Sequence, residues 1–334
     1  MSFEDFLEEW RNSKGFIEVH TSGSTGQPKL MRLDKEFVKE SAQRTIDFFH
    51  LDSDSRLHSC VAADYIGGKM MAVRSELVNC RFSWEIPSNR PLTQIDSSGK
   101  ITLLAVVPSQ MDYIVDNLSE LPKIENIIVG GAPIPPLLRK KIARSGLNAY
   151  ETYGMTETAS HIALRKISEE DIPFKTLEGI KVNVDKDSCL QIILPDGERY
   201  NTNDIGVLLS EKEFFIAGRK DNVINTGGKK INPEILENKL SDYLGYPVML
   251  SSMDDDKWGE RLVLLMESQS PEEEMVKEMG KKEILNRLRE ILPGWQLPKD
   301  LYFVSHLPKT PNGKIKRLKG KALDSFLNHQ ESQK

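Results

Sequence analysis

Short apolar runs alternate with amphipathic stretches over the first half of the chain, up to about residue 154. Each run is four to eight residues long, and the segment that follows it carries apolar residues at helical spacing. The predicted strand and helix pairs are 56–62 with 69–78, 101–107 with 111–121, and 126–129 with 137–143, and a further strand is predicted over 148–152. This alternation predicts stacked β-α units around a largely parallel sheet.

The pattern changes twice in the second half. Residues 180–224 contain short apolar runs broken by Asp196-Gly197 and Asn203-Asp204, which predicts antiparallel hairpins. From about residue 231 we expect a small α+β domain, because a helix start at Asn232-Pro233 precedes runs at 248–251, 262–266 and 302–304 and a charged helical stretch at 281–292. The predicted division is residues 1–218 and 219–334.

Composition limits the class of protein. The 334 residues are 39% apolar and 28% charged, which suits two unequal globular domains. A formal net charge of -5 argues against a nucleic-acid partner, which needs clustered Lys and Arg. No apolar run reaches the roughly 20 residues of a membrane span, and the acidic start does not resemble a signal peptide. We expect a cytoplasmic protein without a membrane partner. The sequence does not decide whether the protein forms a homo-oligomer.

The three cysteines are Cys60, Cys80 and Cys189. Their odd number and wide separation indicate neither a disulfide framework nor a Cys-x-x-Cys zinc site. We expect buried thiols.

Residues 21–29 read Thr-Ser-Gly-Ser-Thr-Gly-Gln-Pro-Lys and follow the apolar run 16–19. Hydroxyl groups and glycines at this density let a tight turn direct several N–H and O–H donors at one anion. The spacing is not that of a Walker A loop, because Pro28 precedes the lysine. Alone, the stretch fits a flexible linker as well as a phosphate site. The candidate phosphate-binding residues are Thr21, Ser22, Gly23, Ser24, Thr25, Gly26 and Lys29.

Three later segments have a similar character. Tyr153 ends a predicted strand, where its ring can stack on a flat base while Thr156 and Glu157 face a phosphate and its Mg²⁺. Asp204 and Arg219 supply a carboxylate and a guanidinium that could grip a diol. A loop near the end of the chain, stiffened by Pro and Gly, carries a lysine at position 314. Taken singly, these segments also fit a turn, a surface ion pair and a solvated loop.

Taken together and in this order, the segments resemble the adenylate-forming superfamily of acyl-CoA synthetases, aryl-CoA ligases, luciferases and peptide-synthetase adenylation domains. The resemblance runs from Thr21 to Lys314, nearly the whole chain. Residues 130–135 are similar to the adenine and acyl loop of that superfamily, residues 225–234 to its glycine turn, and Trp258-Gly259-Glu260 to a signature of its small domain.

The resemblance implies a two-step reaction that uses ATP, Mg²⁺ and coenzyme A. A small-molecule carboxylic acid attacks the α-phosphate to give an acyl-adenylate and pyrophosphate, and coenzyme A then displaces AMP. The implied catalytic residues are Lys314, which would bridge the carboxylate and the α-phosphate, Thr156, and Glu157, which would also hold Mg²⁺. Loop 21–29 would hold the β- and γ-phosphates.

The resemblance also implies nucleotide-binding and hinge residues. Adenine, ribose and thiol-channel positions map to Gly131, Ala132, Pro133, Tyr153, Asp204, Arg219, Gly227, Gly228 and Lys229. The small domain would rotate about Asp221 between the two steps. The implied fold is α/β, with a large adenylate-forming domain of stacked β-α units plus a small β region, followed by a mobile small α+β C-terminal domain.

The chain departs from the family pattern at three places. Family members carry a long segment ahead of the phosphate loop, which begins here at residue 21, so we expect the exposed flank and part of the acyl pocket to differ. Lys309 stands where the last motif usually has arginine, and Glu151 where many relatives have Gln or Asn near adenine.

Substrate choice rests on the segment from Tyr65 to Arg74. It looks like the helix that begins with His-x-x-Gly in o-succinylbenzoate–CoA ligases of menaquinone biosynthesis, with Tyr65 in place of the histidine. A dicarboxylic substrate would give Lys69 or Arg74 a partner for its spare carboxylate, although both could instead face solvent. The alternatives are an aryl- or fatty-acyl-CoA ligase, a module that loads a carrier protein, and a catalytically impaired nucleotide-binding remnant.

Overall fold

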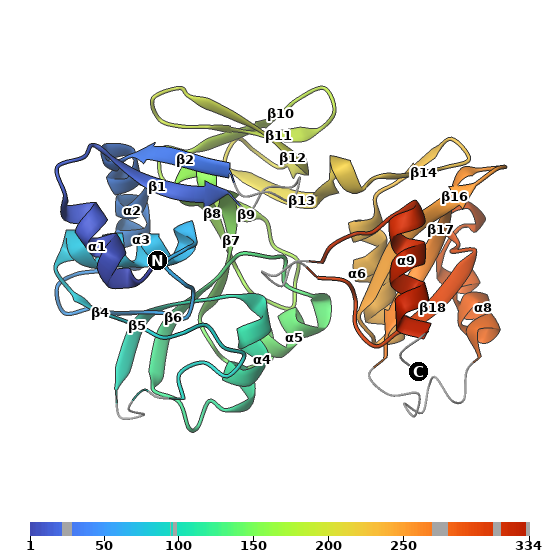
Figure 1. Ribbon diagram of the computed structural model, residues 1–334, viewed down its shortest axis with the longest axis horizontal. Helices are drawn as coiled ribbons and strands as arrows, with labels where there is room; N and C mark the ends of the chain where they lie inside the picture. Colours follow the sequence, from blue (N-terminus) through green and yellow to red (C-terminus); the bar gives the residue numbers. More distant parts are fainter. Residues whose placement is uncertain (22–28, 94, 96–98, 269–279, 310–314, 332–334) are drawn as a thin grey trace.

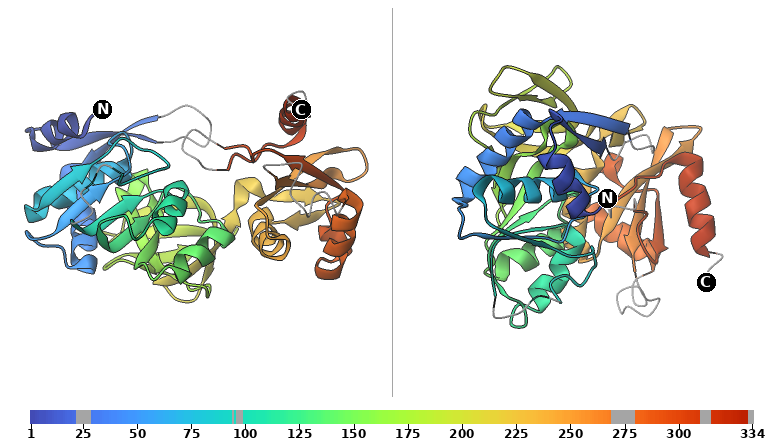
Figure 2. Two further views of the ribbon diagram at one scale, coloured as in Figure 1. Left: turned by 90° about the horizontal axis from the view of Figure 1, so that it is seen from below. Right: turned by 60° about the vertical axis from the view of Figure 1, so that its left-hand side comes forward.

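The computed structural model describes residues 1–21, 29–93, 95, 99–268, 280–309 and 315–331. These residues form a larger unit that ends with strand β13 and a smaller unit that begins with strand β14 (Figure 1). Figure 2 shows the same division from two other directions. No helix in the described ranges is both long and apolar enough to cross a membrane.

The larger unit is built on one 11-stranded sheet, counted over the described residues, in the order β10-β11-β12-β13-β9-β8-β7-β6-β5-β3-β4. Neighbours from β4 to β7 are parallel, and those from β7 to β10 are antiparallel. The strands are β3 (Arg56–Ser59), β4 (Arg81–Trp84), β5 (Lys100–Val106), β6 (Lys123–Val129), β7 (Ala149–Met155), β8 (Ser160–Lys166), β9 (Phe174–Thr176), β10 (Lys181–Val184), β11 (Cys189–Ile193), β12 (Arg199–Leu208) and β13 (Glu213–Arg219).

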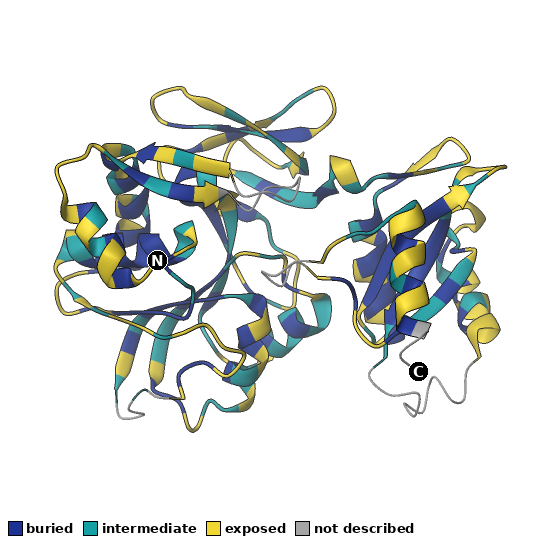
Figure 3. Ribbon diagram, in the orientation of Figure 1, coloured by how far each residue is buried: buried dark blue, intermediate teal, exposed yellow. Residues whose placement is uncertain are grey.

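Helices cover both faces of the parallel half. Leu104 and Val129 pack with α4 (Pro108–Asp116) and α5 (Pro136–Arg144) on one face. Leu103 and Ile128 pack with α2 (Lys35–Phe49) and α3 (Ile66–Val78) on the other. Successive residues of a strand point to opposite faces, so a strand covered on both sides must be apolar throughout. Figure 3 shows these central strands as buried.

The amino-terminal elements cover α3 from outside. They are α1 (Phe3–Arg11) and the antiparallel hairpin of β1 (Phe16–Thr21) and β2 (Lys29–Asp34). Their apolar side chains share one core cluster with α3, which includes Phe6, Val19 and Val73. The hairpin therefore stands on the larger unit as a separate two-stranded sheet.

The smaller unit is a five-stranded sheet with helices on both faces, and α6 and α8 pack on the face opposite α9. Its described elements are β14 (Ile224–Thr226), β15 (Lys229–Ile231), α6 (Pro233–Leu244), β16 (Val248–Asp255), β17 (Gly259–Glu267), α8 (Lys281–Ile291), β18 (Asp300–Val304) and α9 (Gly320–Glu331). Two single turns, η2 (Lys220–Asn222) and η3 (Gly294–Gln296), precede β14 and β18.

The two units meet closely at Gly218, near the end of β13. A side-chain carbon at this position would lie 2.3 Å from Asn232 Oδ1 and 2.7 Å from Glu234 Oε2, so only glycine fits. Lys319 donates to the Val223 carbonyl at 3.0 Å, and Lys140 pairs with Asp242 at 2.8 Å. Backbone contact and polar bonds thus hold the smaller unit against α5 and β13.

Several sequence-based predictions need correction. The predicted small β region is present and continues the same sheet, because β8 pairs antiparallel with β7. β4 and α2 had not been predicted. Helix α6 does begin at Pro233, but the Asn232 side chain makes no capping hydrogen bond. Its Oδ1 is instead buried without a hydrogen-bond partner among the described residues.

Glu151 holds the layers of the larger unit together. Its carboxylate lies on β7 and accepts from Arg139 of α5 at 2.5 Å and from Arg165 of β8 at 2.7 Å, with 7% of the side chain exposed. Burial raises the pKa of this carboxyl, but the guanidinium groups of Arg165 and Arg139 outweigh it and hold the pKa below its usual value.

We expect Glu151→Gln to lower the free energy of unfolding by about 3 kcal/mol at neutral pH, near the lower cost of breaking a buried ion pair, because the amide still accepts one hydrogen bond. A depressed folded-state pKa stabilises the fold above the unfolded value and loses that effect as pH falls through the folded value. The difference between parent and variant, measured by urea unfolding, should therefore shrink below about pH 4.3. Glu169→Gln, which removes the exposed pair with Arg144, should change little. Equal effects of both variants would contradict this role.

Candidate functional site

The predicted adenine loop leaves the carboxyl end of β6 beside the end of β7. A side-chain carbon on Gly130 would lie 2.6 Å from Thr152 Oγ1, so the loop packs directly on β7. Gly131 has a φ of 87°, in the region that favours glycine, and its nearest neighbour would be a Val107 methyl at 3.5 Å. The turn at Gly131 to Pro133 is therefore open to a ligand at the edge of a parallel sheet where α/β proteins bind small molecules.

Tyr153, Asp204 and Arg219 meet at this edge, and we call them the Asp204 cluster. The Tyr153 hydroxyl donates to Asp204 Oδ2 at 2.8 Å, and Arg219 donates to Asp204 Oδ1 at 3.1 Å. Burial and the Asp204 carboxylate both raise the pKa of Tyr153, so the phenol stays protonated as a donor. The Asp204 side chain is 20% exposed, and Arg219 is 42% exposed. The cluster is held rigidly yet reaches solvent.

Curvature of the sheet makes this cluster possible. Three strands separate β7 from β12 in the sheet order, so a flat sheet would hold Tyr153 and Asp204 far apart. The register shifts between Tyr153 and Gly154 in β7 and between Ile205 and Gly206 in β12. Such bulges bend a sheet, and here they bring the antiparallel half around to the carboxyl ends of the parallel strands.

A tight turn places Thr156 and Glu157 directly after β7. They begin the single turn η1 (Thr156–Thr158), in which Thr158 Oγ1 accepts from the Met155 N–H at 3.2 Å and donates to the Ser160 carbonyl at 2.9 Å. A side chain on Gly154 would collide with the Ser160 carbonyl at 2.2 Å. The backbone therefore fixes both residues beside Tyr153. Sequence reasoning did not assign Gly154 and Thr158 these roles, although both lie within the motif.

The candidate phosphate loop is anchored against this turn. Thr21 and Lys29 are paired at the loop end of the β1–β2 hairpin, and β1 contacts η1. The other predicted residues of this loop lie outside the described residues: Ser22, Gly23, Ser24, Thr25 and Gly26. The loop thus leaves and re-enters the fold next to Glu157.

Helix α3 carries two buried cations with different surroundings. Lys69 lies 3.7 Å from Glu9 Oε2 and 4.2 Å from the centre of the Phe6 ring, so it faces α1. Arg74 is 1% exposed, and its Nε and one terminal nitrogen have no hydrogen-bond partner among the described residues. Its other terminal nitrogen lies 3.6 Å from the Met71 sulfur. Burial lowers the pKa of Arg74 to about 9, so it remains charged at neutral pH.

Arg74 has a neutral basic neighbour instead of an acid. His161 of β8 is 5% exposed, and its Nε2 lies 2.9 Å from Thr45 Oγ1. Burial and the nearby Arg74 charge lower the pKa of His161 well below its usual value. An uncompensated interior guanidinium is costly unless it has a functional partner. Periodicity alone could not identify His161, because it falls in an apolar run.

The remaining predicted residues belong to the smaller unit or to the link between the two units, residues 220–223. Asp221 lies in η2 and accepts from Arg219 at 3.0 Å, next to the Asp204 cluster. Gly227 and Gly228 form the turn from β14 to β15 that Lys229 follows, and the Gly227 N–H donates to the Trp258 carbonyl at 2.9 Å. Among the described residues, no hydrogen bond or ion pair joins this turn to the Asp204 cluster.

Lys314 lies outside the described residues, but the flanks of its segment are well defined. Lys309 and Ile315 form an antiparallel bridge, and the Lys316 N–H donates to the Pro308 carbonyl at 2.8 Å. Arg317 then makes two bonds to the buried Glu237, at 2.5 and 2.9 Å, and a third to the Leu250 carbonyl. This anchor fixes the end of the segment to the core of the smaller unit.

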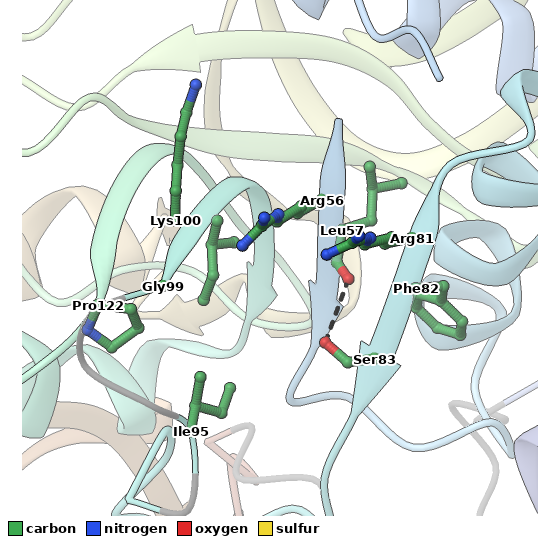
Figure 4. Close-up of a pocket in the computed structure, with 10 residues that line it drawn as sticks. Arg56, Leu57, Arg81, Phe82, Ser83, Ile95, Gly99, Lys100 and Pro122 are labelled. Carbon is green, nitrogen blue, oxygen red and sulfur yellow. Dashed lines mark hydrogen bonds between the residues drawn. The ribbon is translucent and has the colours of Figure 1, made fainter. Parts of the chain in front are cut away.

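A surface cavity lies at the opposite edge of the sheet from the Asp204 cluster. It is lined by the amino-terminal residues of three neighbouring parallel strands, Arg56, Arg81 and Lys100 (Figure 4). Lys100 pairs with Glu125 at 2.9 Å. Because parallel strands run the same way, this cavity faces away from the predicted nucleotide-binding residues.

Comparison with known proteins gives two family matches. The model described as AMP-binding enzyme matches residues 16–208, and the AMP-binding enzyme C-terminal domain matches residues 250–314. A 2-succinylbenzoate–CoA ligase of Listeria monocytogenes serotype 4b (strain F2365) is 28% identical over 96% of this chain and 72% of that protein.

Two solved structures are also similar. An AMP-forming acyl-CoA synthetase/AMP-acid ligase II-like protein from Dyadobacter fermentans DSM 18053 is 30% identical with a TM-score of 0.61, covering 93% of this chain and 90% of that one. The o-succinylbenzoate coenzyme A synthetase (MenE) of Bacillus subtilis, in complex with ATP and magnesium, has a TM-score of 0.76 at 19% identity, covering 90% and 68%. The latter identity shows a shared fold only.

The first family match covers more than half of the chain and includes the phosphate loop, the turn η1 and Asp204. It also agrees with the resemblance expected from the order of the motifs. The chain therefore belongs to the AMP-binding enzyme family.

Proposed function

We propose that this protein is an AMP-forming acid–CoA ligase whose carboxylic acid is 2-succinylbenzoate, a substrate of menaquinone biosynthesis. The observation that carries the proposal is the fully buried Arg74, which has no acidic partner among the described residues. A substrate with a spare carboxylate would supply that partner. The 2-succinylbenzoate–CoA ligase of Listeria monocytogenes, similar over 96% of this chain, supports the same substrate.

The Asp204 cluster suits the nucleotide half of the reaction. Asp204 is oriented by two donors and remains partly exposed, as a carboxylate that accepts from a ribose diol must be. Adenine would lie between the Tyr153 ring and the open turn at Gly131, Ala132 and Pro133. These residues suit ATP because the nearest atom to a side-chain carbon at Gly131 would be a Val107 methyl, at an ordinary contact distance of 3.5 Å.

Phosphate and metal contacts would come from the hairpin and from η1. Loop 21–29 would bind the β- and γ-phosphates. It follows β1, which contacts η1. Glu157 and Thr156 are held beside it by the backbone of the turn, and a carboxylate oxygen is the hard ligand that Mg²⁺ prefers. Bound Mg²⁺ would neutralise phosphate charge while the carboxylic acid attacks. Lys314 remains, by its motif, the residue proposed to stabilise that transition state.

The second half-reaction would use the smaller unit. Rotation about Asp221 would exchange Lys314 for the turn of Gly227, Gly228 and Lys229 at the reaction centre, where coenzyme A displaces AMP. η2 separates the two sheets by a single turn, which suits a pivot. We also infer that the enzyme acts in the cytoplasm on a small molecule.

The direct test supplies the purified protein with ATP, Mg²⁺, coenzyme A and 2-succinylbenzoate and follows AMP formation. We expect AMP and the acyl-CoA thioester in equal amounts. Benzoate and fatty acids provide the comparison, since an aryl- or fatty-acyl-CoA ligase would prefer them. AMP formation that favours a monocarboxylic acid would reject the substrate, and no AMP with any acid would reject the activity.

We expect Arg74→Met to raise the apparent KM for 2-succinylbenzoate tens-fold or more, because losing the partner of a desolvated carboxylate costs about 2–5 kcal/mol. The KM for ATP should stay near that of the parent. Stability should not fall, since an unpaired buried charge is replaced by an apolar chain of similar length. Lys69→Met is the matched control on the same helix, and it should leave this KM unchanged because Lys69 faces Glu9. A raised KM in Lys69→Met with a parental KM in Arg74→Met would show that Lys69, not Arg74, binds the spare carboxylate.

Asp204→Asn should raise the KM for ATP about tenfold to a hundredfold, because bonds to a charged group contribute about 1.5–3 kcal/mol. The KM for the acid should change far less. Asp187→Asn is the matched control, since Asp187 forms an exposed pair with Lys220 next to Arg219. If both variants had the parental KM for ATP, Asp204 would not be a nucleotide ligand.

A further inference from the structure

Three side chains with metal-binding atoms meet at the carboxyl ends of β3 and β4. His58 lies in β3, Cys60 directly follows β3, and Glu85 directly follows β4. One ligand atom from each lies within 4.8 Å of the other two. His58 and Cys60 are 1% exposed, and the Glu85 side chain is 16% exposed. None of the three has a role in the proposed function.

The main chain fixes the positions of all three residues. His58 is the ladder partner of Ser83 in the parallel pair of β3 and β4. The Glu85 N–H donates to the Ser59 carbonyl at 3.2 Å, and the Cys60 N–H donates to the Ala105 carbonyl at 3.0 Å. The cluster is therefore built on three adjacent strands.

Hydrogen bonding defines the state of the His58 ring. Its Nδ1 lies 2.8 Å from the Ser83 hydroxyl, and that hydroxyl donates to the Leu57 carbonyl, as the dashed line in Figure 4 shows. The bond from Ser83 to the Leu57 carbonyl is long, at 3.5 Å. In the tautomer in which Ser83 accepts from Nδ1–H, a lone pair remains on Nε2. Nε2 is buried with no hydrogen-bond partner among the described residues and lies 3.8 Å from Glu85 Oε2. A cation between these two electron-rich atoms would satisfy both.

The other two ligands are also oriented. The Leu92 N–H lies 3.0 Å from each Glu85 oxygen, which fixes the carboxylate. Ligand side chains in metal sites are commonly held in this way by outer hydrogen bonds.

We propose that His58, Cys60 and Glu85 bind one divalent transition-metal ion of the zinc class. Imidazole, thiolate and carboxylate are the ligands of such ions, whereas Mg²⁺ prefers oxygen alone. Bonds of about 2.0–2.3 Å to a tetrahedral ion separate its ligands by about 3.3–3.7 Å, so donors that lie within 4.8 Å of one another would need to close by about 1 Å. The fourth position would be filled by water from the exposed side of Glu85.

Binding is an exchange of a proton for a metal ion. The Cys60 thiol loses its proton to solvent as the metal–sulfur bond forms, and nothing is oxidised or reduced. The burial of two of the ligands indicates a structural role. The metal would hold the chain after β4 against β3, where Gln110 already donates to the Cys60 and Ser88 carbonyls at 3.1 Å each.

The test uses the whole protein, purified without a polyhistidine tag, stripped with a chelator and titrated with Co²⁺ in the absence of nucleotide. We expect about one equivalent to bind, with the charge-transfer band of a cobalt–thiolate bond and the visible bands of a tetrahedral site. Zn²⁺ should displace the Co²⁺. Failure to bind Co²⁺ saturably would overturn the proposal, without bearing on ligase activity.

Variants identify the ligands. Cys60→Ser should abolish the charge-transfer band and weaken Co²⁺ binding by at least about 100-fold, beyond the effect of an outer contact. Cys80→Ser is the matched control and should keep both. Ser83→Ala leaves the three ligands in place and should weaken binding about 10–100-fold. Should Cys60→Ser not fold, Glu85→Gln gives the same affinity readout. A band that survives in Cys60→Ser, or parental affinity in Glu85→Gln, would reject the site.

Discussion

The carboxylate of Asp204 links the two halves of the larger sheet, and the candidate nucleotide site depends on that link. Its two bonds come from Tyr153 on the last parallel strand and from Arg219 at the end of the antiparallel half. The antiparallel strands are thus drawn toward the edge where the β6 and β7 loops emerge. The chain then leaves directly from Arg219 into the smaller unit. Asp204 therefore connects the last parallel strand to the end of β13, the point from which the chain continues to the smaller unit.

The larger unit contains a buried charge with ionic partners, Glu151, and a buried charge without one among the described residues, Arg74. Glu151 is compensated by two arginines and holds layers together. Arg74 is not compensated by any described acid, although an apolar side chain could fill the same volume. The first arrangement contributes stability, whereas the second has a cost that only an external anion would offset. This contrast is the physical reason to place the spare carboxylate of the substrate at Arg74.

Much of the fold was predictable because parallel strands covered on both faces must be apolar throughout. The runs at 101–107 and 126–129 correspond to β5 and β6, and the motifs identified the family. Other features depend on contacts that sequence spacing does not contain. Lys69 and Arg74 were equal candidates for binding the substrate carboxylate in the sequence. The packing of α1 distinguishes them, because Glu9 of α1 faces Lys69 and not Arg74. The spacing of Cys60 along the chain did not indicate a metal site. His58 and Glu85 lie near it only because β3 and β4 pair in the sheet. The roles of the predicted site residues remain predictions.

The Arg317 anchor has a mechanical consequence. Glu237 of α6 and the Leu250 carbonyl of β16 hold its guanidinium from two sides, so the chain at this point moves with the core of the smaller unit as one body. Lys319, two residues later, is bonded to the Val223 carbonyl in the link. The link at Val223 is therefore tied to the chain two residues beyond the Arg317 anchor. In the proposed rotation about Asp221, the segment that ends at Arg317 would therefore move with the core of the smaller unit.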